Sequence, residues 1–578
     1  MKHKFIIPIV LIGALAFSGC NKVLDKQNLT AVNPSDVWSN ASLATAYLNN
    51  IYSALMPGNT YGSGNGTDEG VAYQHQTSGW LLGTATADSY DAFGMYKNIR
   101  NINILLANID KATFDAATKS AIKGQGLFWR AWAYYSLVKS YGGVPLILVP
   151  QSPSNLDSLA LPRNTTTQCV AQIVKDLDDA IALLPGSWSQ GDFGRIDKAA
   201  AMAFKGRVLL FFASPLFNPS GDQAKWQAAY DACLAAKNFC DANGKGLYPV
   251  YSQIWDNQPN QEDVMMREFS YPQSTYFQGG LIPLNWSKDD VGYDRPSLEL
   301  VNSFPMKDGS AWNPATMSYD TLFKNRDDRF YANIYYNGDP IQYLAGMRAA
   351  NTYLWTYFES ITNYDGATGL EGNHNNVTSD PLWSNSSFYR MKAVDKNITQ
   401  GQVYNAAVDW PEIRYAEVLM NYGEAANELN KTSEALNVLY AIRKRAGILP
   451  GAGNNYGITA TTQADIRTAY QNERFVEFCF EGKRWDDLRR WKRFDILNNM
   501  HQRHGLAILL KPGQTDVNPL DDINVVWNKF TSTVIATDKA DINLPDQYYI
   551  YGIPKADMDR NSKLVQNNNW GGSFDPMQ

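Results

Sequence analysis

The feature that most constrains this chain is the spacing of its apolar residues, which recur every three or four positions through two long blocks. In the first block, from about residue 34 to 242, one predicted helical face consists of Leu127, Ala131, Tyr134, Val138 and Tyr141. Gly142-Gly143 then predicts the end of that helix. The same periodicity predicts helices over 43–55, 96–109, 169–184, 196–212 and 226–240.

The second block begins after Trp410-Pro411, where proline suits the first turn of a helix. Apolar faces predict helices over 415–429, 435–446, 462–480 and 484–497. Two antiparallel helices in every ~35–40 residues is the spacing of tetratricopeptide-like repeats. We therefore predict a mostly α fold, with tetratricopeptide-like helix pairs as a scaffold. The tail, from about 505 to 578, reads as irregular and is expected to wrap the helical body.

Between the two blocks, over about 243–410, the helical periodicity fades. Glycine, proline, asparagine and aspartate become frequent there, and aromatic residues crowd together. Long loops in a compact protein are usually functional or disordered, and the aromatic content argues against disorder. We predict a loop-rich insert that contains short strands.

Composition excludes several classes of protein. Only the N-terminus offers an apolar stretch that resembles a membrane segment of ~20 residues, so a protein with several membrane-spanning helices is excluded. Aromatic residues make up 13% of the chain, which excludes general disorder. A formal charge of -6, without clustered Lys and Arg, argues against a nucleic-acid partner.

The N-terminus has the pattern of a targeting signal. A positive start is followed by a short apolar run, small residues and then Cys20, which is the order of a bacterial lipoprotein signal. Cleavage before Cys20 leaves a residue able to carry acyl chains that anchor the protein on a membrane; an ordinary secretory signal is the alternative. The predicted regions are a signal peptide at 1–19, helical regions at 20–242 and 411–578, and the variable region at 243–410, all packed as one unit.

The four other cysteines form no disulfide framework. Cys233 and Cys240 lie about 10 Å apart on one face of a predicted helix that rises about 1.5 Å per residue, too far apart for a disulfide. We predict that these cysteines, with Cys169 and Cys479, are mostly buried thiols.

A series of short sequence motifs, taken in the order in which they occur in this chain, resembles a known family. The motifs are Cys20-Asn-Lys-Val-Leu-Asp25, Ala131-Trp-Ala-Tyr-Tyr-Ser-Leu137, Tyr141-Gly-Gly-Val-Pro-Leu146, Gly194-Arg-Ile196, Ser214-Pro-Leu-Phe-Asn218, Asn325-Arg-Asp-Asp-Arg-Phe330, Arg414-Tyr-Ala-Glu-Val-Leu419, Ile442-Arg-Lys-Arg-Ala-Gly447, Glu477-Phe-Cys-Phe-Glu-Gly-Lys-Arg-Trp-Asp486, Ile553-Pro554 and Gln566-Asn-Asn-Asn-Trp570. Together they resemble the RagB/SusD family of outer-membrane lipoproteins from Bacteroidetes-type bacteria, over essentially the whole mature chain.

The resemblance implies tetratricopeptide-like helix pairs packed against a variable, loop-rich part that holds the ligand site. It implies glycan capture at the cell surface by a lipid-anchored outer-membrane protein. It also implies a partner, a TonB-dependent transporter of the SusC type, over which the lipoprotein closes as a lid. Members of the family are binding proteins and not enzymes, and no cofactor is expected.

Sugar rings present apolar C–H faces and polar rims, so a glycan site needs flat aromatic side chains beside hydrogen-bonding groups. The densest aromatic stretch is 330–364, within which Tyr353, Trp355 and Tyr357 alternate. If that stretch is extended, the three rings project from one face about 6.6 Å apart, a spacing that suits neighbouring sugar units. The alternative is a strand whose rings pack on the helical body.

Other candidate ligand contacts come from two further regions. Trp80, Asp88 and Tyr90 lie in a polar loop that often borders the ligand site in the family, and Trp286, Tyr293 and Trp312 lie in the loop-rich middle. By contrast, the tryptophans within helical patterns are expected to be core residues: Trp129, Trp132, Trp485 and Trp491.

Signals of catalysis and metal binding are weak. Glu473, Glu477 and Glu481 recur on one predicted helical face, which is compatible with paired catalytic carboxylates, but neighbouring Arg and Lys residues favour a structural ion-pair cluster. His501-x-x-His504 reads as a solvated pair that lacks a third metal ligand. Asp521-Asp522 lacks the spacing of an EF-hand, although an aspartate-rich loop is compatible with structural Ca²⁺. From these patterns together we predict no catalytic residue and no bound metal.

Three functions stay open at this level. The leading hypothesis is a surface glycan-binding lipoprotein that delivers its ligand to a SusC-type transporter. The second is a peptide- or protein-binding uptake lipoprotein of the same family. The third is a glycoside hydrolase, for which the chain carries no familiar catalytic motif.

Overall fold

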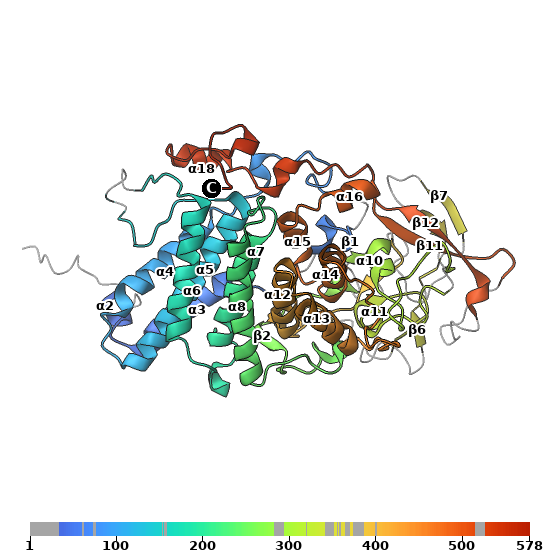
Figure 1. The fold of residues 1–578 in the computed structure, drawn as a ribbon, viewed down its shortest axis with the longest axis horizontal. Helices are drawn as coiled ribbons and strands as arrows, with labels where there is room; N and C mark the ends of the chain where they lie inside the picture. Colours follow the sequence, from blue (N-terminus) through green and yellow to red (C-terminus); the bar gives the residue numbers. More distant parts are fainter. Residues whose placement is uncertain are drawn as a thin grey trace, which may run out of the picture.

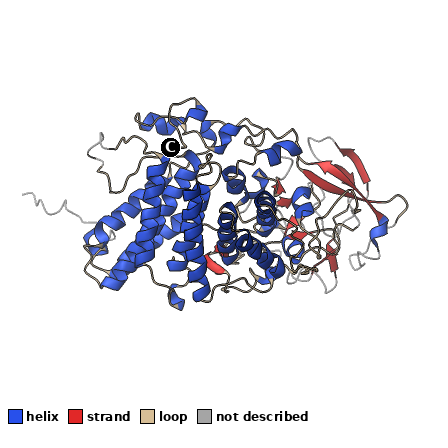
Figure 2. Cartoon of the chain, in the orientation of Figure 1, coloured by secondary structure: helices blue, strands red, loops and turns tan. Residues whose placement is uncertain are grey.

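The computed structural model describes residues 34–59, 63–72, 77–152, 154, 159–282, 294–318, 321–341, 352–354, 356–357, 360–364, 370–373, 386–398, 402–514 and 526–578. Within these ranges the chain is mostly helical, as predicted. It forms an elongated body with long helices at one end and short strands at the other (Figures 1 and 2). None of the helices in these ranges combines the length and the apolar character needed to cross a membrane.

The first helical block forms the bundle at one end of the body (Figure 1). Its helices are α2 (Pro34–Val37), α3 (Ala41–Leu55), α4 (Met95–Ile109), α5 (Ala116–Tyr141), α6 (Thr166–Leu183), α7 (Lys198–Ala213) and α8 (Gln223–Ala242). Several begin at a polar side chain that accepts a hydrogen bond from the first turn, as Asp115, Thr165 and Asp222 do. These helices confirm the predicted spans to within about one turn, except that α5 begins well before the predicted face.

The end of α5 shows why the predicted stop lies where it does. Gly142 has a φ of 74°, a conformation that glycine adopts at no steric cost. A Cβ atom at Gly142 would lie 2.6 Å from Cβ of Pro576, so the tail passes directly over this glycine. The turn thus requires glycine both for its conformation and for its close contact.

The second helical block lies beside the first, at the centre of the body (Figure 1). It consists of α12 (Tyr415–Glu428), α13 (Thr432–Arg445), α14 (Gln463–Glu477), α15 (Arg484–Arg490) and α16 (Asp495–Met500). Two predicted spans were too long. The helix predicted to reach 480 ends at Glu477, where the chain turns through Phe480 at a φ of 59°, and the helix predicted over 484–497 is divided at Lys492, whose φ is 57°.

The strands are short and pair only two at a time. They are β1 (Gly70–Val71), β2 (Asp263–Arg267), β3 (Arg295–Pro296), β4 (Ile334–Tyr335), β5 (Asp339–Ile341), β6 (Thr352–Leu354), β7 (Ser360–Tyr364), β8 (Leu370–Asn373), β9 (Tyr389–Arg390), β10 (Trp410–Arg414), β11 (His504–Leu510) and β12 (Phe530–Ala536). Every pair is antiparallel: β1 with β3, β2 with β10, β4 with β9, β5 with β6, β7 with β8 and β11 with β12.

Short helical turns interrupt the loops that make up the rest of the described chain. They are α10 (Leu298–Ser303), α11 (Asp328–Asn333), α18 (Lys555–Arg560), and the 3₁₀ turns η1 (Ser63–Gly66), η3 (Ala87–Ser89), η5 (Gln190–Asp192), η6 (Tyr251–Gln253), η7 (Gly279–Leu281), η9 (Trp527–Lys529), η10 (Asp546–Tyr549) and η11 (Asn568–Trp570).

The tail differs in part from its prediction as irregular chain. β11 and β12 pair over their whole length, from His504 opposite Ala536 to Leu510 opposite Phe530. Beyond them, residues 546–578 cover the ends of α5 and α6 (Figure 1), as the predicted wrapping requires. The backbone N–H of Tyr551 donates to Ser140 O at 2.8 Å, and Thr166 Oγ1 donates to Pro576 O at 2.6 Å.

The apolar interior joins the two helical blocks. The largest cluster of buried side chains includes Trp129 of α5, Phe204 of α7 and Leu419 of α12. A second cluster, around Phe330 and Phe480, lies in the loop-rich part. Trp129 and Trp491 are buried and Trp132 and Trp485 partly buried, which confirms their prediction as core residues. Cys169, Cys233, Cys240 and Cys479 are buried free thiols, as predicted.

Candidate functional site

An exposed aromatic surface lies in the loop-rich part of the chain. Its rings are those of Phe269, Tyr271, Tyr276, Phe277 and Tyr404, and we call it the aromatic loop surface. Tyr271 and Tyr404 are 63% and 69% exposed. Among the large apolar and aromatic side chains of the described residues, only Val149, at 66%, is as exposed. Two chain segments carry these rings and run side by side, because Tyr276 N–H donates to Ala406 O at 2.9 Å.

Local hydrogen bonds hold the rings in place. Ser270 and Ser274 exchange backbone hydrogen bonds of 2.7 Å, which close the turn that carries Tyr271. The N–H of Phe269 donates to Asp409 Oδ1 at 2.6 Å, and burial raises the pKa of this carboxyl to about 6. The turn is thus fixed from within, so Tyr271 needs no contact of its own to stay ordered.

The rings also brace one another. The centroids of Phe277 and Tyr404 lie 4.6 Å apart at an interplanar angle of 32°, and those of Phe269 and Tyr276 lie 5.1 Å apart. Exposed rings that are supported from below offer flat apolar faces beside backbone and side-chain polar groups. That combination suits the C–H face and hydroxyl rim of a sugar.

Tyr271, Phe277 and Tyr404 are not among the residues predicted from the sequence to contact ligand. Aromatic density directed attention to 330–364, whereas these three rings come from two separate segments that only the fold brings together. The one available signal was Tyr271-Pro272 within a segment rich in glycine and polar residues, which indicates an exposed turn.

A second ring cluster contains three of the predicted residues. The centroid of Tyr551 lies 4.8 Å from that of Trp80 and 4.6 Å from that of Tyr90. Tyr90 is 36% exposed, Trp80 is half-buried, and exposed Asp88 accepts a hydrogen bond from Lys555 N–H at 2.7 Å. The fold therefore brings Trp80, Asp88 and Tyr90 together, against the tail rather than against the loop-rich middle.

Two other predicted contacts are interior residues. Trp312 is 6% exposed, with its ring 5.4 Å from the Arg326 guanidinium, and Tyr357 is 1% exposed, 4.9 Å from the ring of Phe530. Their faces are covered by the second core, so neither ring is available to a ligand in this structure. β6 ends at Leu354, so the extended stretch predicted to present Tyr357 does not continue that far.

The remaining predicted residues have little or no description. Tyr353 lies in β6, opposite Pro340 of β5, and only its backbone is described. Trp286, Tyr293 and Trp355 lie outside the described residues, as do Cys20, the signal peptide and Asp521-Asp522.

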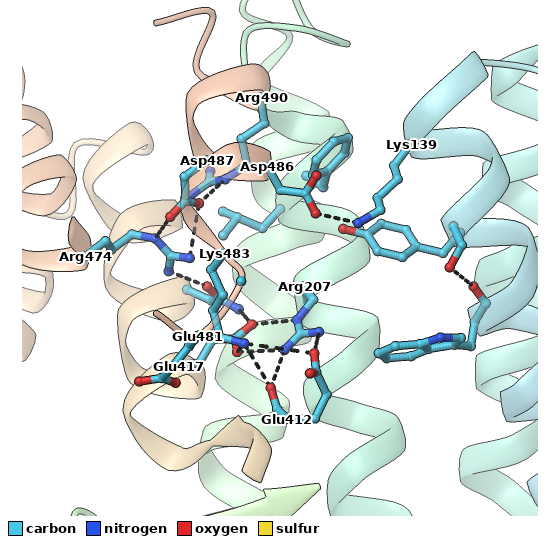
Figure 3. Close-up of a pocket in the computed structure, with 17 residues that line it drawn as sticks. Lys139, Arg207, Glu412, Glu417, Arg474, Glu481, Lys483, Asp486, Asp487 and Arg490 are labelled. Carbon is cyan, nitrogen blue, oxygen red and sulfur yellow. Dashed lines mark hydrogen bonds and ion pairs between the residues drawn. The ribbon is translucent and has the colours of Figure 1, made fainter. Parts of the chain in front are cut away.

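A charged cavity of about 140 Å³ lies where the two helical blocks meet (Figure 3). Its walls come from α5, α7, α12, α14, α15 and the turn at Gly482. Its charged lining residues are Lys139, Arg207, Glu412, Glu417, Arg474, Glu481, Lys483, Asp486, Asp487 and Arg490.

Ion pairs join the walls of the charged cavity (Figure 3). Lys139 Nζ of α5 lies 2.5 Å from Asp486 Oδ2 of α15, and Arg207 of α7 contacts Glu417 of α12 at 2.6 Å. Burial alone would raise the pKa of Asp486, but the Lys139 ammonium and the Arg489 guanidinium together outweigh burial and lower that pKa. These pairs cross from one block to the other, so the cavity lies along a seam that ion pairs hold together.

The three glutamates considered as catalytic candidates belong to a deeper network. We define the glutamate network as Glu262, Glu473, Glu477 and Glu481 with Arg329, Arg414, Arg443, Arg445 and Lys392. Arg414 contacts Glu477 at 3.1 Å and Glu481 at 2.7 Å, and also pairs with Glu262. The prediction of a structural ion-pair cluster is confirmed, although Glu481 follows α14 instead of lying on it.

The electrostatics of the network oppose acid catalysis. Burial would raise the pKa of Glu477, but the guanidinium groups of Arg445, Arg414 and Arg329 outweigh it and lower the pKa to about 2. A general acid needs a pKa near the working pH. Glu477 is instead ionised and fully paired at neutral pH.

The two histidines do not share one helical turn. His501 follows α16, whereas His504 begins β11 and lies 2.6 Å from Glu299 Oε1, a hydrogen bond that raises the pKa of His504. The expected solvated pair was wrong for His504, which is half-buried and bonded. Over the described part of the chain, no three His, Cys, Asp or Glu side chains lie where one metal ion could bind them.

Family models match most of the chain. A model described as the SusD family matches residues 252–570, and one described as starch-binding associating with outer membrane matches residues 24–210. The first match contains the aromatic loop surface and the whole glutamate network.

Curated relatives and solved structures agree with these matches. SusD-like protein P2 of Formosa agariphila is 24% identical over 410 residues, which cover 69% of this chain and 70% of that protein. A SusD-like protein of Bacteroides fragilis has a TM-score of 0.73 at 23% identity, covering 92% of this chain and 98% of its own. A second protein of that organism, described as a SusD-like carbohydrate-binding protein, has a TM-score of 0.71 at 22% identity, covering 91% and 99%.

Proposed function

Because this chain belongs to the SusD family, we propose that it is a cell-surface lipoprotein that binds oligo- or polysaccharide and delivers it to a TonB-dependent transporter of the SusC type. The observation that carries the proposal is the aromatic loop surface, where Tyr271 and Tyr404 are 63% and 69% exposed. Large exposed rings on a stable frame are costly unless they serve binding, since they add apolar surface that invites aggregation.

We assign the main glycan platform to Tyr271, Phe277 and Tyr404. Tyr404 and Phe277 form one continuous ring surface, and Tyr271 stands on the turn beside it. Stacking on flat aromatic rings tolerates many sugars, because each pyranose ring has an apolar face. Specificity then comes from hydroxyl contacts around the rings.

Trp80, Asp88 and Tyr90 form a proposed accessory contact. Their cluster has one exposed ring, Tyr90, and one exposed carboxylate, Asp88, which is the minimum set for a weak sugar contact. Trp286, Tyr293, Tyr353 and Trp355 stay proposed ligand contacts on the basis of sequence alone. Trp312 and Tyr357 are left out because their rings are buried.

The anchor and the absence of catalysis are part of the same proposal. Acylation of Cys20 would tether the protein to the outer membrane, and the family description of outer-membrane association supports that location. Replacing Cys20 by serine should move the protein from the membrane fraction to the soluble fraction and abolish labelling by a fatty acid. We expect glycan to be recovered uncut, since the candidate catalytic glutamates Glu473, Glu477 and Glu481 are ion-paired.

The binding test uses affinity electrophoresis and calorimetry over polysaccharides, oligosaccharides, glycoprotein glycans and peptides. Tyr404→Ala and Tyr271→Ala should each weaken glycan binding at least tenfold, which is about 1.4 kcal/mol. Leu449→Ala is the control, because Leu449 is 53% exposed and lies outside both ring clusters. Binding of peptides and of no glycan would replace this function by peptide uptake, and release of reducing ends would indicate a hydrolase.

The partnership is tested separately. The protein and a SusC-type transporter should co-purify from detergent-solubilised outer membranes of the source bacterium. Purification of the lipoprotein without any TonB-dependent transporter, under conditions that preserve other membrane complexes, would contradict delivery while leaving glycan binding intact.

A further inference from the structure

A small cavity lies beside the start of α7, away from the surfaces already described. Its volume is about 200 Å³, and its lining includes Trp188, Phe193, Arg195, Asp197, Lys245 and Asp263. It shares no lining residue with the charged cavity or the aromatic loop surface. Exposed Gly186, Ser187 and Asn243 also line it, so it opens to solvent.

One wall of this cavity is apolar. The indole of Trp188 is half-buried and fixed, because its Nε1–H donates to Ile196 O at 3.0 Å. Phe193 and Met265 extend the apolar wall. A tryptophan held by its own hydrogen bond presents a ring face without further loss of side-chain entropy on binding.

The other wall carries three charged groups. Asp197 accepts the first-turn hydrogen bond of α7 from Ala200 N–H at 2.8 Å, and Lys245 Nζ donates to the backbone oxygen of Asp263 at 2.5 Å. Asp263 is 3% exposed and accepts from Asn260 N–H at 2.7 Å through Oδ2. Its Oδ1 is buried with no hydrogen-bond partner in this structure.

A buried carboxyl oxygen without a partner is costly, and a ligand that supplies one removes that cost. Burial raises the pKa of Asp263 to about 7 and that of Asp197 to about 6, with the Lys245 ammonium opposing both shifts. Near neutral pH these carboxyls therefore exchange a proton readily and can donate as well as accept. Hydroxyl groups, which also do both, are their natural partners.

We propose that this cavity, which we call the ring pocket, binds a single neutral sugar ring, stacked on Trp188 and hydrogen-bonded by Asp197, Lys245 and Asp263. The ring pocket is smaller than the ~300–1,000 Å³ of clefts that hold drug-sized ligands, so it takes one ring and not an oligomer. A neighbouring hollow of about 520 Å³ shares Trp188 and Arg195 with it and leaves room for the rest of a chain. The choice of a sugar as ligand rests on the proposed function.

The experiment is saturation-transfer NMR on the full-length protein with glucose, galactose, mannose and xylose as probes, followed by titration of any sugar that binds. Asp263→Asn keeps an acceptor for Asn260 N–H but puts an amide NH₂ group in place of the unpartnered oxygen. Trp188→Ala removes the ring face. Asp559→Asn, at an exposed ion pair of α18, is the matched control. Thermal melts by circular dichroism establish that each variant is folded, and Trp188→Leu, which keeps bulk but has no aromatic ring, replaces Trp188→Ala if the latter unfolds.

We expect at least one monosaccharide to bind the unmodified protein. Its affinity should be at least tenfold weaker in Asp263→Asn and in the Trp188 variant, and unchanged in Asp559→Asn. Binding that survives both ring-pocket variants, or no binding at all, overturns the proposal. The same samples are tested with polysaccharides. If the protein binds polysaccharide but no monosaccharide, the ring pocket proposal is wrong and the aromatic loop surface proposal stands. If it binds a monosaccharide through Asp263 but no polysaccharide, the aromatic loop surface proposal is wrong and the ring pocket proposal stands.

Discussion

The glutamate network buries charged side chains in the interior, whereas the aromatic loop surface exposes aromatic side chains to solvent. In the network, Glu477 and Arg414 are almost completely buried, and every charge has several partners. On the surface, Tyr404 is 69% exposed and rests on a single ring, Phe277. We therefore expect the network to stabilise the frame only while it is complete, and the surface rings to contribute little to stability.

The difference teaches where mutations act. Removing one partner of a buried ion pair strands the other charge in the interior, which is far costlier than losing an exposed contact. Removing an exposed ring leaves no cavity and no unpaired group, so its loss should appear in binding and not in folding. The predictions below test this contrast, from the largest expected effect on stability to the smallest.

Arg414→Met should lower the free energy of unfolding by about 3–5 kcal/mol, because it leaves Glu262, Glu477 and Glu481 without their shared guanidinium. Urea titration monitored by circular dichroism measures the change. The matched control is Arg467→Met, which breaks a two-pronged pair with Glu428 whose arginine is 40% exposed, and should cost at most about 1 kcal/mol. Equal losses in the two variants would remove the contrast.

Acid should weaken the network before it affects the rings. The pKa of Glu477 is about 2 in the folded chain against an ordinary value of 4.5, so the stability that this group gives is complete above pH 4.5. That stability is lost as the pH falls from 4.5 towards 2, and Glu477 alone accounts for about 3–4 kcal/mol at about 1.4 kcal/mol per pKa unit. Urea midpoints measured across this range should fall; a flat profile would contradict the paired, ionised state.

Glu69→Gln should have the opposite sign at neutral pH. Burial first, and then the neighbouring Asp68, raise the pKa of Glu69 to about 8, so the folded chain keeps a proton that the unfolded chain releases above its ordinary 4.5. Stability therefore falls as the pH rises between these two values. Glutamine keeps the acceptor for Phe480 N–H, and should raise the free energy of unfolding by about 1–3 kcal/mol near pH 7.5 but not near pH 4.

A control with the same logic is Asp559→Asn, at an exposed pair, whose effect should be small at both pH values. A Glu69→Gln variant that is equally destabilised at both pH values would show that the carboxyl is ionised and partnered in the folded chain.

Tyr404→Ala should change the free energy of unfolding by less than about 0.5 kcal/mol while weakening glycan binding at least tenfold. The same substitution at Tyr357, which is 1% exposed, should cost about 3 kcal/mol or more through the cavity it leaves. Urea titration and calorimetry on both variants separate the two effects. A Tyr404 variant that unfolds easily but binds normally would move this ring from function to structure.

The frame was predictable because its residues interact with near neighbours in sequence. Helix faces repeat over short distances, and caps or glycines such as Asp115 and Gly142 mark the ends. The glutamates of α14 were recognisable as structural for the same reason. Their partner Arg329, however, comes from about 150 residues earlier, and no local pattern identifies such a pairing.

The ligand surface was far less predictable. Tyr353, Trp355 and Tyr357 alternate as strand residues do, yet Tyr357 lies beyond β6 and is buried. The spacing of aromatic residues is the same whether their rings face the core or the solvent. Whether a ring is buried or exposed therefore depends on how distant segments pack. The segments that carry Tyr271 and Tyr404 are more than 130 residues apart in the chain, and they lie side by side because Tyr276 and Ala406 are backbone partners.

The path of the tail has a consequence for how the protein is made. Residues 546–578 cover the ends of α5 and α6, as the bond from Tyr551 N–H to Ser140 O shows. A chain synthesised from its N-terminus therefore leaves these helix ends uncovered until residues 546–578 have been made. Exposed apolar surface at that stage invites misassembly, so removal of residues 546–578 should lower the yield of folded protein.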